Sequence, residues 1–112
     1  IDALCGALNL GDIGQHFPNT PNNKNISSIE LVKKIMLLTP SNISIINIDA
    51  SIVLNNPKIS KYKSKIISKL APVLKISESQ ISIKGITSNG LSFLNMKNGW
   101  GAEVIISLKK WK

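Results

Sequence analysis

The chain has 112 residues, the length of one small domain, and its 14 basic and 6 acidic residues give a net charge of +8. All 14 basic residues are Lys, which excludes the bidentate guanidinium contacts that Arg makes with phosphate or guanine. One His (His16) and one Cys (Cys5) exclude a Cys/His zinc site and an intrachain disulfide, and a Ser-His-Asp triad could use only His16.

The composition argues against nucleic-acid and membrane partners. Lys, Asn and Ile are the residues that an A+T-rich coding sequence favours, so we attribute much of the positive charge to composition. Aromatic residues make up 4% of the chain, too few for the stacking platforms that bind single-stranded nucleic acid. No segment approaches the roughly 18 consecutive apolar residues of a transmembrane helix.

The first third of the chain predicts two helices separated by a loop. Residues 1–9 are apolar and indicate the end of a buried helix, which we expect to begin upstream because no initiator Met is present. Residues 10–25 are rich in Gly, Pro and Asn and predict a loop. Ser27 and Glu30 have capping-box spacing, so a helix is expected to follow to about Leu38 and to end at residues 39–42.

The rest of the chain predicts strand, helix, strand and strand. Residues 43–54 are β-branched and mostly alternate, and the slip at Ile45-Ile46 indicates either a bulge or the true start of the strand. After a turn at 55–58, an apolar stripe from Ile59 predicts a helix that Pro72 kinks or ends early. Residues 77–80 predict a polar loop, 81–86 a strand, 87–101 a loop, and 102–108 a final strand before a basic tail.

This order predicts one domain, residues 1–112, of the α/β class: an α+β two-layer sandwich with a mixed sheet and helices on one face. The strands are apolar toward both faces in places, since Ile46, Ile48 and Ile52 alternate with Ile45, Ala50 and Val53 close by. The face without helices then needs a partner, which points to oligomerisation through the sheet.

The first candidate ligand-binding loop is residues 10–20. Gly11 and Gly14 flank Asp12, and a carboxylate in such a tight loop can accept hydrogen bonds from sugar hydroxyls. The alternative is an Asx turn that joins two helices. His16 in the same loop is expected to be an exposed surface residue, and Cys5 a small buried hydrophobic residue.

Two further loops carry groups suited to phosphate. Pro57 and Lys58 join a strand end to a helix start, where a Lys suits a phosphate; an ordinary Pro in a first helical turn is the alternative. Thr87 and Ser88 leave a strand in a Gly-bearing loop that can hold phosphate oxygens; a polar hairpin turn is the alternative. The Lys-rich helix over 58–75 is read as a solvated face, with an anion-binding patch as the alternative.

Taken together, these loops resemble those of 2-C-methyl-D-erythritol 2,4-cyclodiphosphate synthases. Leu10-Gly11-Asp12-Ile13-Gly14 and Phe17-Pro18-Asn19-Thr20 closely resemble their signature Leu-Gly-Asp-Ile-Gly…Phe-Pro-Asp-Thr. Asn56-Pro57-Lys58 is similar to their Ala-Pro-Lys, and Ile83-Lys84-Gly85-Ile86-Thr87 to their Val-Lys-Ala-Thr-Thr. The resemblance covers essentially the whole chain, which corresponds to the C-terminal two thirds or more of such a synthase.

The resemblance implies a homotrimer with active sites between neighbouring subunits, in the bacterial cytoplasm or the plastid stroma. It implies a lyase of non-mevalonate isoprenoid biosynthesis. The 2-phosphate of a cytidine-diphosphate-linked methylerythritol attacks the β-phosphate, expels CMP and closes a cyclic diphosphate. Two divalent metals, zinc with magnesium or manganese, would neutralise the phosphates.

The resemblance also assigns roles to residues. The first loop would bind the substrate, with Asp12 and Gly14 on the ribose hydroxyls, Ile13 between them, and Phe17, Pro18 and Thr20 around the methylerythritol part. In the second loop, Pro57 and Lys58 would bind the cytidine diphosphate. In the third, Thr87 would stabilise the transition state, and Phe93 would line a channel on the trimer axis that can hold an isoprenoid diphosphate.

Departures from the family pattern concern the metals. The family's Asp-x-His pair and later His fall upstream of Ile1, and Asn89 stands where a Glu binds the second metal. Ile86 and Met96 replace a Thr and an Arg. No metal ligand is therefore assigned to this chain. The alternative function is a non-catalytic trimeric descendant that binds cytidine nucleotide or isoprenoid diphosphate.

Overall fold

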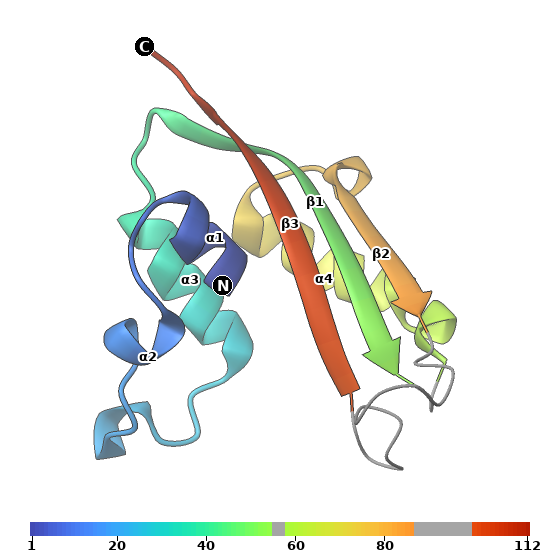
Figure 1. Cartoon of the computed structure of the whole chain (residues 1–112), viewed down its shortest axis with the longest axis horizontal. Coiled ribbons are helices and arrows are strands. Elements are labelled where there is room, and N and C mark those ends of the chain that lie inside the picture. Colours follow the sequence, from blue (N-terminus) through green and yellow to red (C-terminus); the bar gives the residue numbers. More distant parts are fainter. Residues whose placement is uncertain (55–57, 87–99) are drawn as a thin grey trace.

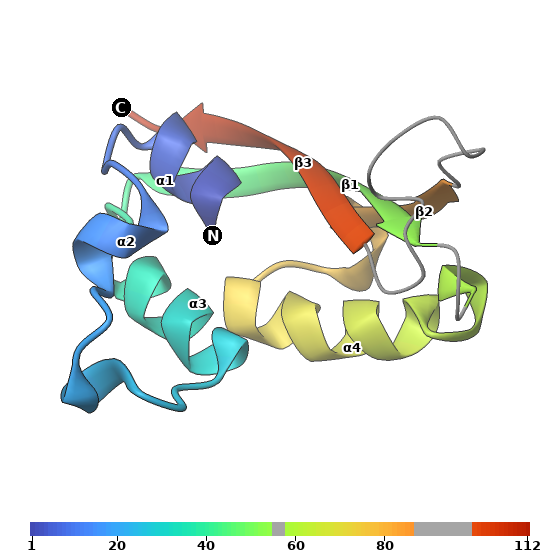
Figure 2. The same ribbon diagram turned by 60° about the horizontal axis from the view of Figure 1, so that its bottom comes forward.

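The computed structural model describes residues 1–54, 58–86 and 100–112. Helices lie on one side of a three-stranded sheet of order β2-β1-β3 (Figures 1 and 2). Strand β1 pairs in parallel with β2 and antiparallel with β3, so the sheet is mixed, as predicted. The elements are α1 (Asp2–Ala7), α2 (Ile13–His16), η1 (Pro21–Asn23), α3 (Ser28–Leu38), β1 (Ile43–Leu54), η2 (Ile59–Lys61), α4 (Lys63–Leu74), η3 (Glu78–Gln80), β2 (Ile81–Ile86) and β3 (Trp100–Lys110).

Helix α3 follows its predicted start and end. The Ser27 hydroxyl accepts a hydrogen bond from the Glu30 backbone N–H at 3.2 Å, and the helix ends at Leu38. The Glu30 carboxylate pairs instead with Lys33, one turn along the helix, at 3.2 Å. The predicted cap therefore operates through Ser27.

Two segments predicted as loops contain short helices. Within residues 10–25 lie α2 and η1, and residues 78–80 form η3. Each of α2 and η3 begins with a side-chain capping box, and η1 begins with Pro21, which suits a first helical position. The prediction of plain loops was wrong there, because a cap can stabilise a single turn that carries no apolar periodicity.

Helix α4 passes through Pro72 and does not end there, contrary to one predicted outcome. It continues to Leu74 and stops at Lys75, which adopts a left-handed conformation with φ 58°. The N–H of Lys75 donates to Pro72 O at 3.2 Å and that of Ile76 to Ala71 O at 3.1 Å. These two bonds form a Schellman motif, which satisfies the final carbonyls and fixes the helix end.

The slip at Ile45-Ile46 is a bulge and not the start of the strand, since β1 begins at Ile43. The pairing with β3 shifts between Ile45 and Asn47, so Ile46 is an extra residue on β1. Nε2 of Gln80, at the end of η3, donates to Ile45 O at 3.1 Å and to Ile46 O at 2.9 Å. A side chain far along the chain thus satisfies two carbonyls at the irregular point of the strand.

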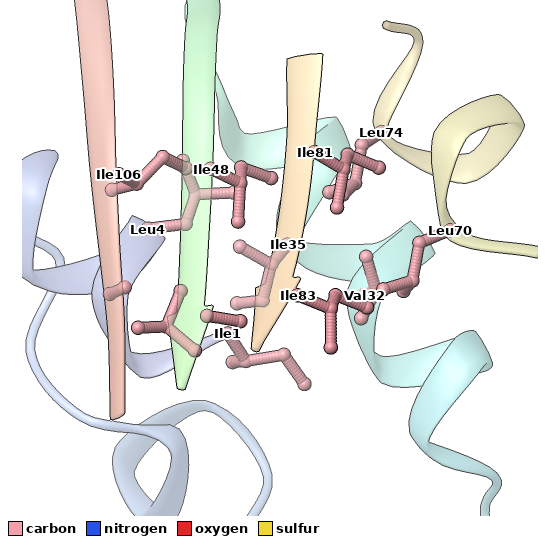
Figure 3. A pocket seen from close by; sticks show the side chains of 13 residues that line it. Ile1, Leu4, Val32, Ile35, Ile48, Leu70, Leu74, Ile81, Ile83 and Ile106 are labelled. Atoms are coloured by element: carbon pink, nitrogen blue, oxygen red, sulfur yellow. The ribbon is translucent and has the colours of Figure 1, made fainter. Parts of the chain in front are cut away.

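The core lies between the sheet and the helices. One cluster joins β1, β2 and α4, and a second joins α1 to α3 through Leu4, Cys5 and Ile35. Cys5 is fully buried, as predicted, and burial raises the pKa of its thiol. Figure 3 shows a cavity of about 140 Å³ between the sheet and α1, α3 and α4. Its lining side chains are all aliphatic, so it offers no group for acid–base or ionic chemistry.

The other face of the sheet carries no helix (Figure 2). Ile46, Ile86 and Ile105 are 44%, 48% and 64% exposed. Ile105 pairs across the sheet with Asp49, which lies between the inward-facing Ile48 and Ala50, so Ile105 points to the uncovered side. None of the helices in the described part of the chain has the length and apolar character needed to cross a membrane.

Candidate functional site

Asp12 lies at the start of α2 and caps it. Its Oδ1 accepts a hydrogen bond from the Gln15 N–H at 2.9 Å, and Gln15 Oε1 accepts one from the Asp12 N–H at 3.0 Å. Asp12 is exposed. Among the described residues only Oδ1 of this carboxylate accepts a hydrogen bond, which leaves Oδ2 facing solvent for a ligand. Asp12 therefore has the local structural role that the Asx-turn alternative implied, here as a helix cap, and this role is compatible with ligand binding.

The two glycines beside Asp12 make room for this arrangement. Gly11 has φ 86°, in the left-handed region, and a Cβ there would collide with the Gln15 side chain. A Cβ on Gly14 would lie 3.3 Å from Asp12 Oδ1. The Gly-Asp-x-Gly pattern therefore leaves room for both bonds of the capping box, from the Gln15 N–H to the Asp12 carboxylate and from the Asp12 N–H to the Gln15 side chain.

The rest of the loop forms a shallow cavity of about 260 Å³ after α2. Phe17 is half-buried and packs against the α1–α3 cluster, which anchors the loop. The Asn23 side-chain amide donates to Pro18 O at 2.9 Å and approaches Thr20 Oγ1 at 3.4 Å. Four predicted residues, Ile13, Gly14, Phe17 and Pro18, line this cavity, and Thr20 lies beside it through Asn23.

His16 is half-buried, whereas the sequence led us to expect an exposed surface residue. Its Nε2–H donates to Leu10 O at 2.7 Å, and its ring contacts the Phe17 ring with centroids 6.3 Å apart. This bond closes the loop across α2. His16 therefore supports the loop that carries Asp12, and the structure gives it no catalytic partner among the described residues.

Lys58 borders a second pocket, of about 240 Å³, at the carboxyl ends of β1 and β2. It caps η2, and the pocket is closed by that turn and by Lys63, the first residue of α4. The pocket is lined by Leu54, Lys58, Ile59, Ser60, Lys63, Gly85 and Ile86. Carboxyl ends of neighbouring parallel strands are where open α/β sheets bind ligands.

The electrostatics of this second pocket favour an anion. Lys58 and Lys63 both line it, and none of the described residues that line it is acidic. The first turn of α4 contains no acidic residue, and no side chain caps its N–H groups. These N–H groups and the helix dipole add a partial positive charge at the pocket, the arrangement that binds phosphate in many proteins. Sequence reasoning missed Lys63, because it sits in a run of exposed lysines.

The two regions are far apart within one chain. Helix α2 lies at one end of the molecule, and the turn before α4, yellow-green in Figures 1 and 2, lies at the other. The structure thus brings Ile13, Gly14, Phe17 and Pro18 together and places Lys58 elsewhere. Pro57, Thr87 and Phe93 lie outside the described residues, as do Asn89 and Met96.

The described residues do not fit the divalent metals that the resemblance implies. Within 1–54, 58–86 and 100–112, no three His, Cys, Asp or Glu side chains come together as a metal site would require. Zinc in proteins takes three or four such ligands, and magnesium is held through carboxylates. No chemical step is therefore assigned to a metal here.

Comparison with known proteins gives one consistent result. The model of the YgbB family matches residues 1–109. The 2-C-methyl-D-erythritol 2,4-cyclodiphosphate synthase of Caldicellulosiruptor bescii is 43% identical over 108 residues, 95% of this chain and 69% of the relative. The enzyme of the same name from Clostridium novyi is 46% identical over 95 residues, 83% of this chain and 60% of the relative.

Solved structures agree with this result. IspF of Plasmodium falciparum, in a complex with CDP, has a TM-score of 0.85 and 35% identity, over 99% of this chain and 67% of that chain. The bifunctional IspDF of Campylobacter jejuni has a TM-score of 0.89 and 33% identity, over 99% of this chain and 31% of that chain. Sequence and fold therefore lead to one conclusion: this chain belongs to the YgbB family, the family of 2-C-methyl-D-erythritol 2,4-cyclodiphosphate synthases.

Proposed function

We propose that this chain supplies the nucleotide-binding part of a 2-C-methyl-D-erythritol 2,4-cyclodiphosphate synthase. Its substrate is a cytidine-diphosphate-linked methylerythritol 2-phosphate. A 2-phosphate oxygen forms a bond to the β-phosphorus while the bond from that phosphorus to the CMP oxygen breaks, giving the cyclic diphosphate and CMP. The observation that carries the proposal is the basic pocket at the carboxyl ends of β1 and β2.

The basic pocket suits the diphosphate for an electrostatic reason. An anionic 2-phosphate must approach an anionic diphosphate, and CMP leaves with further negative charge. Fixed cations aimed at developing charge lower such a barrier. In the proposed site Lys58 and Lys63, with the amino end of α4, bind the cytidine diphosphate and hold the β-phosphate in place.

The loop around α2 binds the ribose and the methylerythritol part of the substrate. We assign the ribose hydroxyls to Asp12 and Gly14 with Ile13 between them, since Asp12 Oδ2 is open to solvent. Phe17, Pro18 and Thr20 form the part of the site that surrounds the methylerythritol group. By resemblance, Pro57 adjoins the diphosphate pocket, Thr87 stabilises the transition state and Phe93 lines an axial channel for an isoprenoid diphosphate.

A complete site needs two copies of the chain. Helix α2 and the turn η2, which borders the Lys58 pocket, lie at opposite ends of one molecule (Figure 1). A single substrate therefore uses the loop of one copy and the pocket of another. The helix-free sheet face, with its exposed Ile46, Ile86 and Ile105, offers the surface for that contact. We propose a homotrimer, located in the bacterial cytoplasm or the plastid stroma.

One observation favours a second candidate function. Because the described residues hold no metal-ligand cluster, a trimer of this chain can bind cytidine nucleotide or isoprenoid diphosphate without turnover. Only the synthase would need divalent metals, zinc with magnesium or manganese; the non-catalytic descendant would not. The two candidates make the same prediction for CDP binding and opposite predictions for CMP release.

Calorimetry with CDP tests the shared prediction. Lys58→Met keeps the aliphatic stem and removes the charge, so we expect CDP affinity to fall roughly ten- to a hundredfold, the value of one charge-assisted hydrogen bond. Lys69→Met, on the exposed side of α4 and away from the pocket lining, is the matched control and should leave the affinity within about twofold of the unchanged chain.

CMP release from the cytidyl substrate, measured with zinc and magnesium present, separates the candidates. Release that requires Lys58 supports the synthase. Binding of CDP without release supports the non-catalytic descendant. No heat with CDP and no CMP would contradict both.

A further inference from the structure

We infer that Gly85 is a positioning residue for the Lys58 pocket, because its missing side chain is what lets Ile59 sit against β2. Gly85 lies next to the last residue of β2 and pairs with Ile52 of β1. It offers no side chain to a ligand, so its effect must act through Ile59. The inference deepens the proposed function and rests on it for the identity of the ligand.

The contact between these two residues leaves no room for a Cβ at position 85. A Cβ built on Gly85 would collide with Cγ2 of Ile59 and would lie 3.6 Å from its Cβ. Cγ2 is attached directly to the branched Cβ beside the backbone, so it cannot move away as the end of a long side chain could. An Ala at position 85 therefore forces a new χ1 angle or a backbone shift at Ile59.

A shift of Ile59 reaches the ligand-binding groups directly. Ile59 begins η2 and follows Lys58 in the chain, and both line the same pocket. The turn is held by a bond from the Tyr62 N–H to Ile59 O at 2.9 Å and one from the Lys61 N–H to Lys58 O at 3.3 Å. Helix α4 starts at Lys63, directly after Tyr62. The packing of Ile59 against Gly85 of β2 thus sets the position of Lys58 and of the amino end of α4.

Backbone strain does not enter this effect. Gly11 is the glycine with positive φ among those described, so Ala at position 85 is acceptable to the backbone. In a chain without the Ile59 contact, Gly→Ala would be mildly stabilising, because it reduces the freedom of the unfolded chain. A loss caused by Gly85→Ala is therefore attributable to the contact.

The test is a double-mutant cycle on the full chain with Gly85→Ala, Ile59→Leu and the double variant. Leu has a similar volume and no branch at Cβ, so it frees the space that Ala needs. CDP affinity should fall on the order of tenfold in Gly85→Ala and recover in the double variant to the level of Ile59→Leu. Gly6→Ala is the matched control, since nothing lies within 4 Å of a Cβ there, and should bind CDP normally.

Hydrogen exchange of the Tyr62 amide gives a second readout that needs no ligand. It should speed up in Gly85→Ala and return toward normal in the double variant. If the unchanged chain binds no CDP while this exchange pattern holds, the proposed function fails and the positioning of η2 by Gly85 stands. If CDP binds but Gly85→Ala changes neither affinity nor exchange, or if the two substitutions act independently, the inference is wrong.

Discussion

Asp12 combines a structural and a ligand-binding role in one carboxylate, and substitutions can separate them. Asn caps a helix as well as Asp does, whereas Ala removes the cap at a cost of about 1 kcal/mol. We expect Asp12→Asn to keep the thermal midpoint and Asp12→Ala to lower it, because Oδ1 accepts the Gln15 N–H. Both variants should bind CDP more weakly in calorimetry, since both remove the charge offered to the ribose.

A second cap in the chain provides the control. Ser27→Ala removes the cap of α3, where the hydroxyl accepts the Glu30 N–H at 3.2 Å, and should cost a similar amount of stability. It should leave CDP affinity unchanged, because neither pocket is lined by Ser27. Normal CDP binding by a stable Asp12→Asn protein would show that Asp12 is a helix cap and nothing more.

At the level of elements, Gln80 connects η3 to the bulge of β1. Its Nε2 satisfies Ile45 O and Ile46 O, and its Oε1 accepts the Ser77 N–H at 2.8 Å. We expect Gln80→Ala to lower the free energy of unfolding by roughly 1–3 kcal/mol, because two carbonyls at the bulge lose their donor. Urea unfolding measures this value.

Ser79→Ala in the same turn is the control for Gln80. Ser79 is exposed and its hydroxyl makes no hydrogen bond to the described residues, so the free energy of unfolding should change by less than about 0.5 kcal/mol in this variant. Equal stability of the two variants would show that water replaces the Gln80 amide at the bulge and that the turn does not fasten the strand.

The elements that the sequence predicts well are those with a long local pattern. Alternation of apolar and polar residues identified β1 from its first to its last residue. The slip in this alternation lies at the bulge, because both features depend only on neighbouring residues in the sequence. Helix α2 depends on the reciprocal bonds of Asp12 and Gln15 instead of on periodicity, so composition alone suggested a loop. Lys63 lines the same pocket as Lys58 only because β2 and α4 meet in three dimensions, which no local pattern reports.

For the whole molecule, the separation of the two binding regions is the main constraint on function. Helix α2, which Asp12 caps, and the turn η2, which Lys58 caps, lie at opposite ends of a molecule whose longest extent is 46 Å (Figure 1). The sheet face between them is free of helices and carries exposed isoleucines. In the proposed homotrimer, packing through this face would bring the α2 loop of one copy toward the basic pocket of the next, and a head-to-tail ring would repeat that site at every contact.

Mixing two defective chains tests this arrangement. In a ring, a chain with Asp12→Asn still offers Lys58, and a chain with Lys58→Met still offers Asp12, so neighbours of different kinds rebuild an intact site. Equal amounts of the two, unfolded and refolded together, should recover about a quarter of the CDP sites of the unchanged protein, because a site is intact only for one of four neighbour combinations. The stoichiometry of CDP binding measures the recovery, and each variant refolded alone is the control. Mixed oligomers, verified by native mass spectrometry, that recover no sites would contradict a site shared between neighbouring copies, because only such a site can be restored by mixing.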